Sequence, residues 1–188
     1  FGDYIPYSEI NILNEVWLNR ITDTNEEAII SKNQNKNALD YENLLTKVFS
    51  EVNRVLKDDK NVSVVFHSAS SKVWNALKQT FKSANLEVIN NSVLQKEQSS
   101  FKQTNSKISV KGDAVLLLSK GDHATGYEAS EMELLENLIN EAKLKDNPLE
   151  MERERLYSRY VGYCMKNQLT VGLDAKDFYT KIESLVIV

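Results

Sequence analysis

Val-Ser-Val-Val-Phe-His-Ser, residues 62–68, is the stretch that decides the predicted fold of this chain. Its β-branched and aromatic residues, apolar at most positions, predict a strand that is covered on both faces. Amphipathic helices are predicted before and after it, at residues 41–57 and 72–84, because apolar residues recur there at helical spacing. The order helix, buried strand, helix indicates an α/β sheet. Ligands of such sheets bind beyond the carboxyl ends of the strands, so a site is expected where this strand ends.

The remaining elements of the first part of the chain extend this unit. A helix is predicted at residues 8–21, and two further strands at residues 86–94 and 113–119. The long polar connection between these strands indicates an antiparallel pair at one edge of the sheet. The predicted N-caps of the two central helices are Asp40 for the first and Ser70 or Ser71 for the second.

A change of pattern at residues 121–126, which begin and end with glycine, marks the predicted domain boundary. Residues 1–120 are predicted to form a partial α/β domain, and residues 121–188 a helical C-terminal extension. The predicted helices of the extension lie at residues 129–144, at residues 148–166 and after the cap Asp174.

The composition excludes several classes of protein. With 188 residues, 41% hydrophobic and 27% charged, the chain has the composition of a globular protein. No apolar run approaches the roughly 20 residues that a membrane-spanning helix needs. The single cysteine, Cys164, rules out an internal disulfide and favours a reducing compartment, so a cytoplasmic protein is predicted. One cysteine and two histidines cannot form a Cys/His zinc site, and a net charge of −4 leaves only a local basic patch for nucleic acid.

The first residues resemble a known family. Residues 1–9 read Phe-Gly-Asp-Tyr-Ile-Pro-Tyr-Ser-Glu, and residues 16–18 read Val-Trp-Leu. This pattern resembles the adenine-specific DNA methyltransferases, in which an (Asp/Asn)-Pro-Pro-(Tyr/Phe) motif runs on into a Tyr-rich turn and a helix. Phe1 takes the place of the aromatic residue of that motif. Because the chain opens on Phe rather than Met, we expect it to be a portion of a longer protein.

The resemblance extends over residues 1–120 and implies a fold and an activity. The implied fold is α/β, the C-terminal part of a Rossmann-like methyltransferase sheet. The implied activity is transfer of a methyl group from S-adenosylmethionine to the exocyclic amino group of adenine in DNA, with the base flipped out of the helix. In the family, an Asp or Asn accepts the amino hydrogen and the aromatic residue stacks on the base, which contributes about 1–3 kcal/mol.

The resemblance also implies that this chain is the substrate-side half of such an enzyme. The family binds S-adenosylmethionine through a Gly-containing loop after its first strand, and no Gly-rich turn between a strand and a helix occurs in this sequence. The chain is therefore expected to be inactive alone. An upstream methyltransferase half or a partner subunit would complete the enzyme and hold the cofactor.

Three residues are candidates for the catalytic site. Phe1 would stack on the flipped adenine, and Tyr4 would line the same pocket. A frayed terminal aromatic and a tyrosine packed on a helix are the alternatives. His67, at the carboxyl end of the central strand, is the third candidate. A structural histidine is its alternative, because this chemistry needs no strong base beyond the acceptor of the motif.

Basic residues form a second group of candidates. The polar connection at residues 96–111 contains four lysines and one glutamate, and it is predicted to contact DNA phosphates. An ordinary solvated loop is the alternative. Farther along, arginines alternate with glutamates at residues 150–159, which predicts ion pairs within a helix on a solvated face. The four candidate lysines of the connection are Lys96, Lys102, Lys107 and Lys111.

A function of a different class stays open from the sequence. The chain could be a non-catalytic α/β interaction module that binds protein or RNA and uses no methyl donor. Methylation of RNA or protein by the same fold is a third reading. An upstream Asp-Pro-Pro and a Gly-containing cofactor loop in the complete protein would favour the enzyme.

Overall fold

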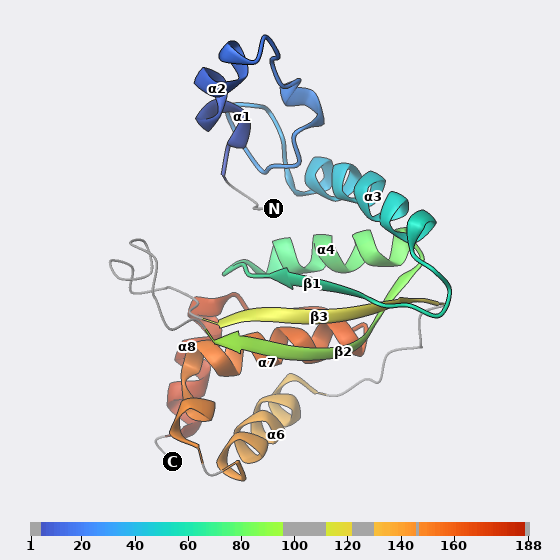
Figure 1. The fold of residues 1–188 in the computed structure, drawn as a ribbon. Helices are drawn as coiled ribbons and strands as arrows, with labels where there is room; N and C mark the ends of the chain where they lie inside the picture. Colours follow the sequence, from blue (N-terminus) through green and yellow to red (C-terminus); the bar gives the residue numbers. More distant parts are fainter. Residues whose placement is uncertain (1–4, 96–111, 122–129, 146, 187–188) are drawn as a thin grey trace.

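The computed structural model describes residues 5–95, 112–121, 130–145 and 147–186. In this part of the chain the fold is mixed α/β, with seven α-helices, two short 3-10 helices and one three-stranded antiparallel sheet (Figure 1). No helix in it combines the length and the apolar character needed to cross a membrane. The elements are α1 (Tyr7–Ile10), α2 (Ile12–Trp17), η1 (Thr24–Glu26), α3 (Ala38–Val55), β1 (Val62–Phe66), α4 (Ser71–Ser83), β2 (Leu86–Gln95), β3 (Gly112–Lys120), α6 (Glu131–Lys143), η2 (Pro148–Met151), α7 (Arg153–Lys166) and α8 (Ala175–Val186).

The strand order in the sheet is β1-β3-β2 (Figure 1). β3 pairs antiparallel with both neighbours, so β1 and β2 run in the same direction. The predicted antiparallel pair of the last two strands is thus confirmed, as is the α/β class. A Rossmann-like methyltransferase sheet, which is mostly parallel, is not established by these three strands.

Helices α4 and α7 both contact strands and cover the same face of the sheet. Residues paired across neighbouring strands point to the same face, and Phe66, Ala114 and Leu116 share one face in this register. The ring of Phe66 meets that of Trp74 on α4 edge-on, with centroids 5.0 Å apart. Asn91, which pairs with Leu116, lies against α7. We call this face, with its fully buried residues Ala114, Leu116 and Leu118, the covered face.

The opposite face of the sheet is left without a covering layer by the helices that the structure describes. Val65 pairs with Val115 across β1 and β3, and Ser63 pairs with Leu117. Val65 is 49% exposed, while Val115 and Leu117 are partly buried. We call these four residues the open face. The prediction that β1 is covered on both faces is therefore wrong for the described residues, because α4 and α7 lie on the same side and β1 is an edge strand.

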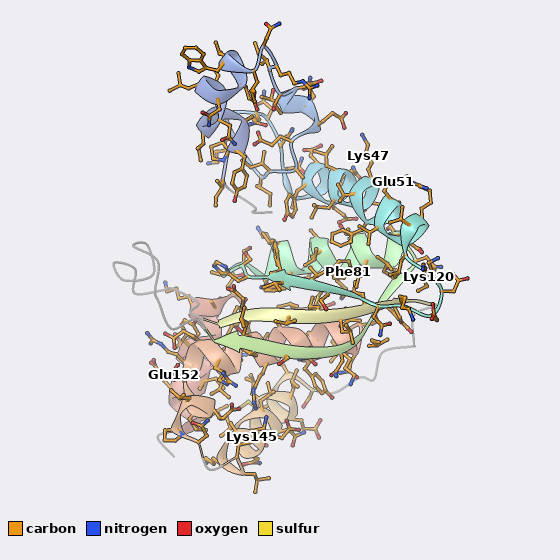
Figure 2. The ribbon with its side chains drawn as sticks, in the orientation of Figure 1. Lys47, Glu51, Phe81, Lys120, Lys145 and Glu152 are labelled. Atoms are coloured by element: carbon orange, nitrogen blue, oxygen red, sulfur yellow. The ribbon has the colours of Figure 1, made fainter. Side chains whose placement is uncertain are left out.

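The pairing of α3 with α4 builds the second layer of the core. Phe49 of α3 meets Phe81 of α4 edge-on at 4.9 Å, and the side chain of Lys47 lies on the opposite, exposed side of α3 (Figure 2). The predicted N-cap of α3, Asp40, is wrong by three residues. Asn37 is the N-cap: its side chain accepts from the backbone of Asp40, whose carboxylate accepts from the Asn37 N–H at 2.8 Å.

The C-terminal helices pack onto the α/β unit. The backbone between α7 and α8 is fastened to α4: Asn75 exchanges two hydrogen bonds of 3.0 Å with Val171, and Lys78 Nζ donates to Leu169 O at 2.8 Å. Burial lowers the pKa of this lysine. The predicted helix at residues 148–166 is divided into η2 and α7. The boundary predicted near residue 121 stays a prediction, and it adjoins residues 122–129, which lie outside the described part.

The cap predicted for α4 at Ser70 or Ser71 is replaced by a tertiary contact. Ser70 occupies the N-cap position but makes no capping hydrogen bond with its side chain. Instead, the carboxylate of Asp174 accepts from the Ser71 N–H at 2.6 Å. A residue predicted to cap the last helix therefore stabilises the start of α4, which favours negative charge near its exposed N–H groups.

Gly162 fixes the distance between α7 and the sheet. A Cβ at this position would lie 2.2 Å from Asn91 Nδ2 and 2.9 Å from Asn91 Cγ. We expect Gly162→Ala to lower the free energy of unfolding by about 1–2 kcal/mol, since overpacking outweighs the gain in helix propensity. Urea unfolding measures the loss. The double variant with Asn91→Ala removes the clashing amide and should recover most of it; no recovery would contradict this packing.

The N-terminal segment is largely exposed. The predicted helix at residues 8–21 is interrupted at Asn11, which separates α1 from α2. Ser8 holds the segment to the following loop, because its Oγ donates to Glu27 Oε2 at 2.6 Å. The apolar side chains of this segment face outward rather than into the core. The exposed apolar side chains of this segment are Tyr7, Ile10, Ile12, Leu13, Val16, Trp17, Leu18 and Ile21.

Candidate functional site at the carboxyl end of β1

The side chains of His67 and Asp113 meet where β1 ends and β3 begins. Phe66 pairs with Ala114, so His67, which follows Phe66, lies opposite Asp113, which precedes Ala114. His67 Nδ1 is 3.5 Å from Asp113 Oδ1. The side chain of His67 is 38% exposed, whereas that of Asp113 is 10% exposed. The sheet register thus presents an accessible imidazole backed by a mostly buried carboxylate.

The turn that follows His67 is held in place by buried hydrogen bonds. Trp74 Nε1 donates to the carbonyl oxygen of Ser68 at 2.8 Å, and the Ser70 N–H donates to Ser68 Oγ at 3.2 Å. The Ala175 N–H donates to the carbonyl oxygen of Ala69 at 2.9 Å. Because residues of α4 and α8 both hydrogen-bond to this turn, the end of β1 is a rigid support for the imidazole of His67.

The start of β3 is anchored separately. Ser158 of α7 donates its hydroxyl to the carbonyl oxygen of Gly112 at 2.9 Å. Gly112 leaves room for this contact, since a Cβ there would lie 2.9 Å from Val93 Cγ1 and 3.3 Å from Ser158 Oγ. Asp113 therefore projects from a backbone whose position is set by α7 and by both neighbouring strands.

The pair has the composition of a proton-accepting site. A carboxylate beside one ring nitrogen favours the tautomer that carries its proton there, which leaves the other nitrogen able to accept a proton or a hydrogen bond. At 3.5 Å the contact is longer than a strong hydrogen bond. Such contacts often tighten when a ligand binds. Among the described residues, no group of three His, Cys, Asp or Glu side chains is placed to hold a metal ion.

Most of the predicted site residues lie outside the described residues. This applies to Phe1, Tyr4 and the four lysines of the 96–111 connection, so the structure describes only His67 of the predicted set. It does describe where that connection leaves and re-enters the sheet. Gln95 pairs with Gly112, so both ends of the connection lie beside Asp113. The lysine-containing connection therefore starts and finishes at the same end of the sheet as His67.

Sequence reasoning missed Asp113 as a partner of His67. The residue was assigned only to the start of a strand, and its apolar neighbours gave no indication of chemistry. The pattern that could have revealed it is a carboxylate at the amino end of a strand antiparallel to the one that ends in His67. Such pairing depends on register, which the single sequence does not specify.

The arginines and glutamates at residues 150–159 also differ from their prediction. Glu150 lies in η2, outside α7, and is only 5% exposed, so it is not on a solvated face. Arg155 NH2 lies 2.7 Å from Glu150 Oε1, and Arg159 bonds the other carboxylate oxygen. Burial acts to raise the pKa of Glu150, but the Arg155 hydrogen bond and the charges of Arg159, Arg155 and Lys145 outweigh it, and the pKa falls below its ordinary value. Cys164, by contrast, is buried, and burial raises the pKa of its thiol to about 12.

Comparison with protein-family models, with curated proteins and with solved structures finds no match to this chain.

Proposed function

We propose that this chain is the substrate-side half of an S-adenosylmethionine-dependent DNA methyltransferase that methylates the exocyclic amino group of adenine. The observation that carries the proposal is the order of elements α3, β1, α4, β2 and antiparallel β3, together with the outer edge of β1, which no described strand pairs with. The resemblance of residues 1–9 and 16–18 to the family supplies the chemistry. Further strands beside β1 would complete a Rossmann-like sheet. In this proposal the complete protein is a cytoplasmic enzyme of DNA modification.

The edge of β1 supports this completion. Natural edge strands usually carry charges, prolines or bulges that prevent pairing with other chains. β1 reads Val-Ser-Val-Val-Phe and has none of these along its five residues. In sequence it is an interior strand, yet in the described residues nothing pairs with its outer edge. A further strand added to this edge, with helices over the open face, would bury Val65 and remove the conflict.

The ends of the elements suggest where the substrate binds. His67, Asp113 and both ends of the lysine-containing connection meet at one end of the sheet. In the proposed enzyme the flipped adenine lies at this end, with Phe1 stacked on it and Tyr4 beside it. His67 accepts a hydrogen bond from substrate rather than replacing the Asp or Asn of the motif. The lysines hold DNA phosphates, and the upstream half binds S-adenosylmethionine.

A second candidate is a non-catalytic interaction module that binds protein or RNA. The observation in its favour is the row of exposed apolar side chains on α1 and α2, which includes Trp17 at 89% exposure. Contiguous exposed apolar surface marks an interaction site. The same surface suits the enzyme if the upstream half packs on it, so only an activity measurement separates the two.

The test of the proposal begins with the intact mass of the complete natural protein, followed by a methyl-transfer assay on DNA. A mass well above the 21.5 kDa of this chain and transfer of labelled methyl groups from S-adenosylmethionine to adenine are the expected results. A complete protein that lacks a cofactor loop and transfers no methyl group to DNA would favour the interaction module. Transfer to RNA or protein alone would redirect the proposal to those substrates.

Within that assay, Phe1→Ala tests base stacking. We expect kcat/KM to fall by about 10- to 100-fold, since stacking on an aromatic face contributes about 1–3 kcal/mol per base. Thermal stability should change little. Phe1→Tyr keeps the aromatic plane and is the matched control, which should retain most of the activity. Equal losses for Ala and Tyr, or an activity loss that parallels a loss of stability, would remove the stacking role.

A further inference from the structure

A polar cavity of about 320 Å³ lies at the outer edge of β2, at a distance in the fold from β1. Residues from four parts of the chain form it: the second half of β2, the end of α6, η2 and α7. Lys145 follows α6 in the lower part of the molecule (Figure 2). The residues that line the cavity are Asn91, Ser92, Val93, Leu138, Glu141, Lys145, Glu150, Arg155, Arg159 and Tyr163.

Positive charge converges in this cavity. The carboxylate of Glu150 contacts three cations: Arg155 at 2.7 Å, Arg159, and Lys145 Nζ at 3.7 Å. Both arginine side chains are mostly buried, with 21% and 14% exposed, whereas Lys145 is half exposed. One buried carboxylate thus serves three cations, and the other lining carboxylate, Glu141, is exposed. The described lining residues keep a net positive charge.

Such an arrangement favours a bound anion over an empty cavity. Arginine stays protonated in proteins, so the excess charge cannot be removed by titration. Partial burial reduces solvation of the guanidinium groups and strengthens their attraction to an anion. Glu150 sets the positions of the arginines beforehand, which lowers the entropic cost of binding. The neutral polar groups of Asn91 and Ser92, on β2, line the same space and can donate further hydrogen bonds.

We propose that this cavity binds a phosphate group that is carried on a larger molecule. Arginine and lysine side chains bind phosphate oxygens through charge-assisted hydrogen bonds, and the three cations and two carboxylates of the described lining leave one net positive charge for the phosphate. The volume is at the lower end of the range for small-molecule pockets, about 300–1,000 Å³, which leaves room for an organic group beyond the phosphate. Tyr163 offers that group an aromatic wall. A free nucleotide and a nucleic-acid backbone are the two sources of such a phosphate, and the experiment separates them.

The inference does not depend on the proposed methyltransferase activity. The cavity is on the strand farthest from β1 in the sheet and shares no residue with the His67 site. Its test is a binding measurement on this chain alone, so a failure here leaves the methyl-transfer proposal standing, and the reverse is also true.

The experiment is a titration of the chain with AMP. Isothermal calorimetry measures the binding, and backbone amide NMR shifts locate it. Inorganic phosphate, adenosine and a short DNA duplex are titrated in parallel. We expect saturable binding of AMP, weaker binding of phosphate, no binding of adenosine, and amide shifts at Asn91, Ser92 and Tyr163. DNA binding that is competed by AMP would identify a backbone phosphate as the natural source. If AMP binds and does not compete with DNA, a free nucleotide is the natural source of the phosphate.

Two substitutions at the rim test the site without disturbing the core. Lys145→Gln should weaken AMP binding about tenfold, which corresponds to the loss of one charge-assisted hydrogen bond. Lys143→Gln removes the same charge two residues away, at an exposed position outside the cavity lining, and should have less than a twofold effect. Ser92→Asp places a carboxylate at an exposed position of the rim and should weaken binding at least tenfold. Absence of AMP and DNA binding, or equal effects of the Lys145 and Lys143 variants, would overturn the proposal.

Discussion

Replacing Val65 by aspartate is expected to leave this chain folded on its own but to disable the complete protein. Val65 lies on the open face and is 49% exposed, so the isolated chain loses only about 1 kcal/mol or less, the range of strand propensities. In the proposed enzyme, a further layer covers this face. An unpaired carboxylate would then be buried at a cost of about 3 kcal/mol, which weakens association of the two halves, or methyl transfer, about 100-fold.

Leu144→Asp is the control for that experiment. It introduces the same charge at an apolar residue that is 85% exposed at the end of α6, away from β1. The comparison uses urea unfolding of the isolated chain and activity, or co-purification of the halves, for the complete protein. If Val65→Asp harms the complete protein no more than Leu144→Asp does, the open face is also open there, and a further layer of helices is ruled out.

Replacing Glu150 by glutamine is expected to lower the free energy of unfolding by about 2–3 kcal/mol at pH 7. Removing one partner from a buried ion pair leaves the other charge uncompensated, and here two arginines and Lys145 would repel one another. The adjoining cavity admits water, which screens this repulsion and keeps the loss below that of a fully buried pair. In a chain of this length the melting temperature should fall by about 5–10 °C. Calorimetry at pH 7 measures the change.

The pH dependence provides a second readout of the same interaction. Because the pKa of Glu150 is lowered in the folded state, the carboxylate stabilises the fold above the pKa it has when unfolded, about 4.3. That stabilisation is lost as the pH falls through the lower folded pKa. The difference between the natural chain and Glu150→Gln should therefore be constant above about pH 5 and shrink below about pH 4.

Glu136→Gln is the matched control for the Glu150 variant. Glu136 is exposed on α6, and its substitution should change stability by less than about 0.5 kcal/mol at any pH. A Glu150→Gln loss that stays the same from pH 7 to pH 3 would show that the effect comes from packing rather than from the ion cluster.

The strands and central helices were predictable because their signals are local. β-branched and aromatic runs specify β1 and β3 within one or two residues, and apolar spacing specifies α3 to within three residues and α4 to within one. The caps were less predictable. Asn37 and Asp40 both suit an N-cap, and only the backbone geometry decides between them. The start of α4 depends on Asp174, which is more than a hundred residues away in the sequence.

The candidate site was predicted only in part. A histidine at the carboxyl end of a strand suggested His67, but Asp113 becomes its partner through the register of β1 with β3. The cluster around Glu150 was assigned to helix-surface pairs because alternating charges usually form them. A 3-10 turn before α7 moves Glu150 off the helix and buries it against Arg155 and Arg159.

The sequence by itself determined which segments are helices and strands, because the spacing of apolar side chains is a local feature. It also determined that the last two strands pair antiparallel, because the polar connection between these strands is local as well. Only the tertiary structure decided that β3 lies between β1 and β2, that α4 and α7 share one face, and that Val65 is left exposed on the other. These features arise from contacts between residues far apart in the chain. Period and propensity report how a segment folds, whereas the choice of neighbour is made by packing against distant surfaces.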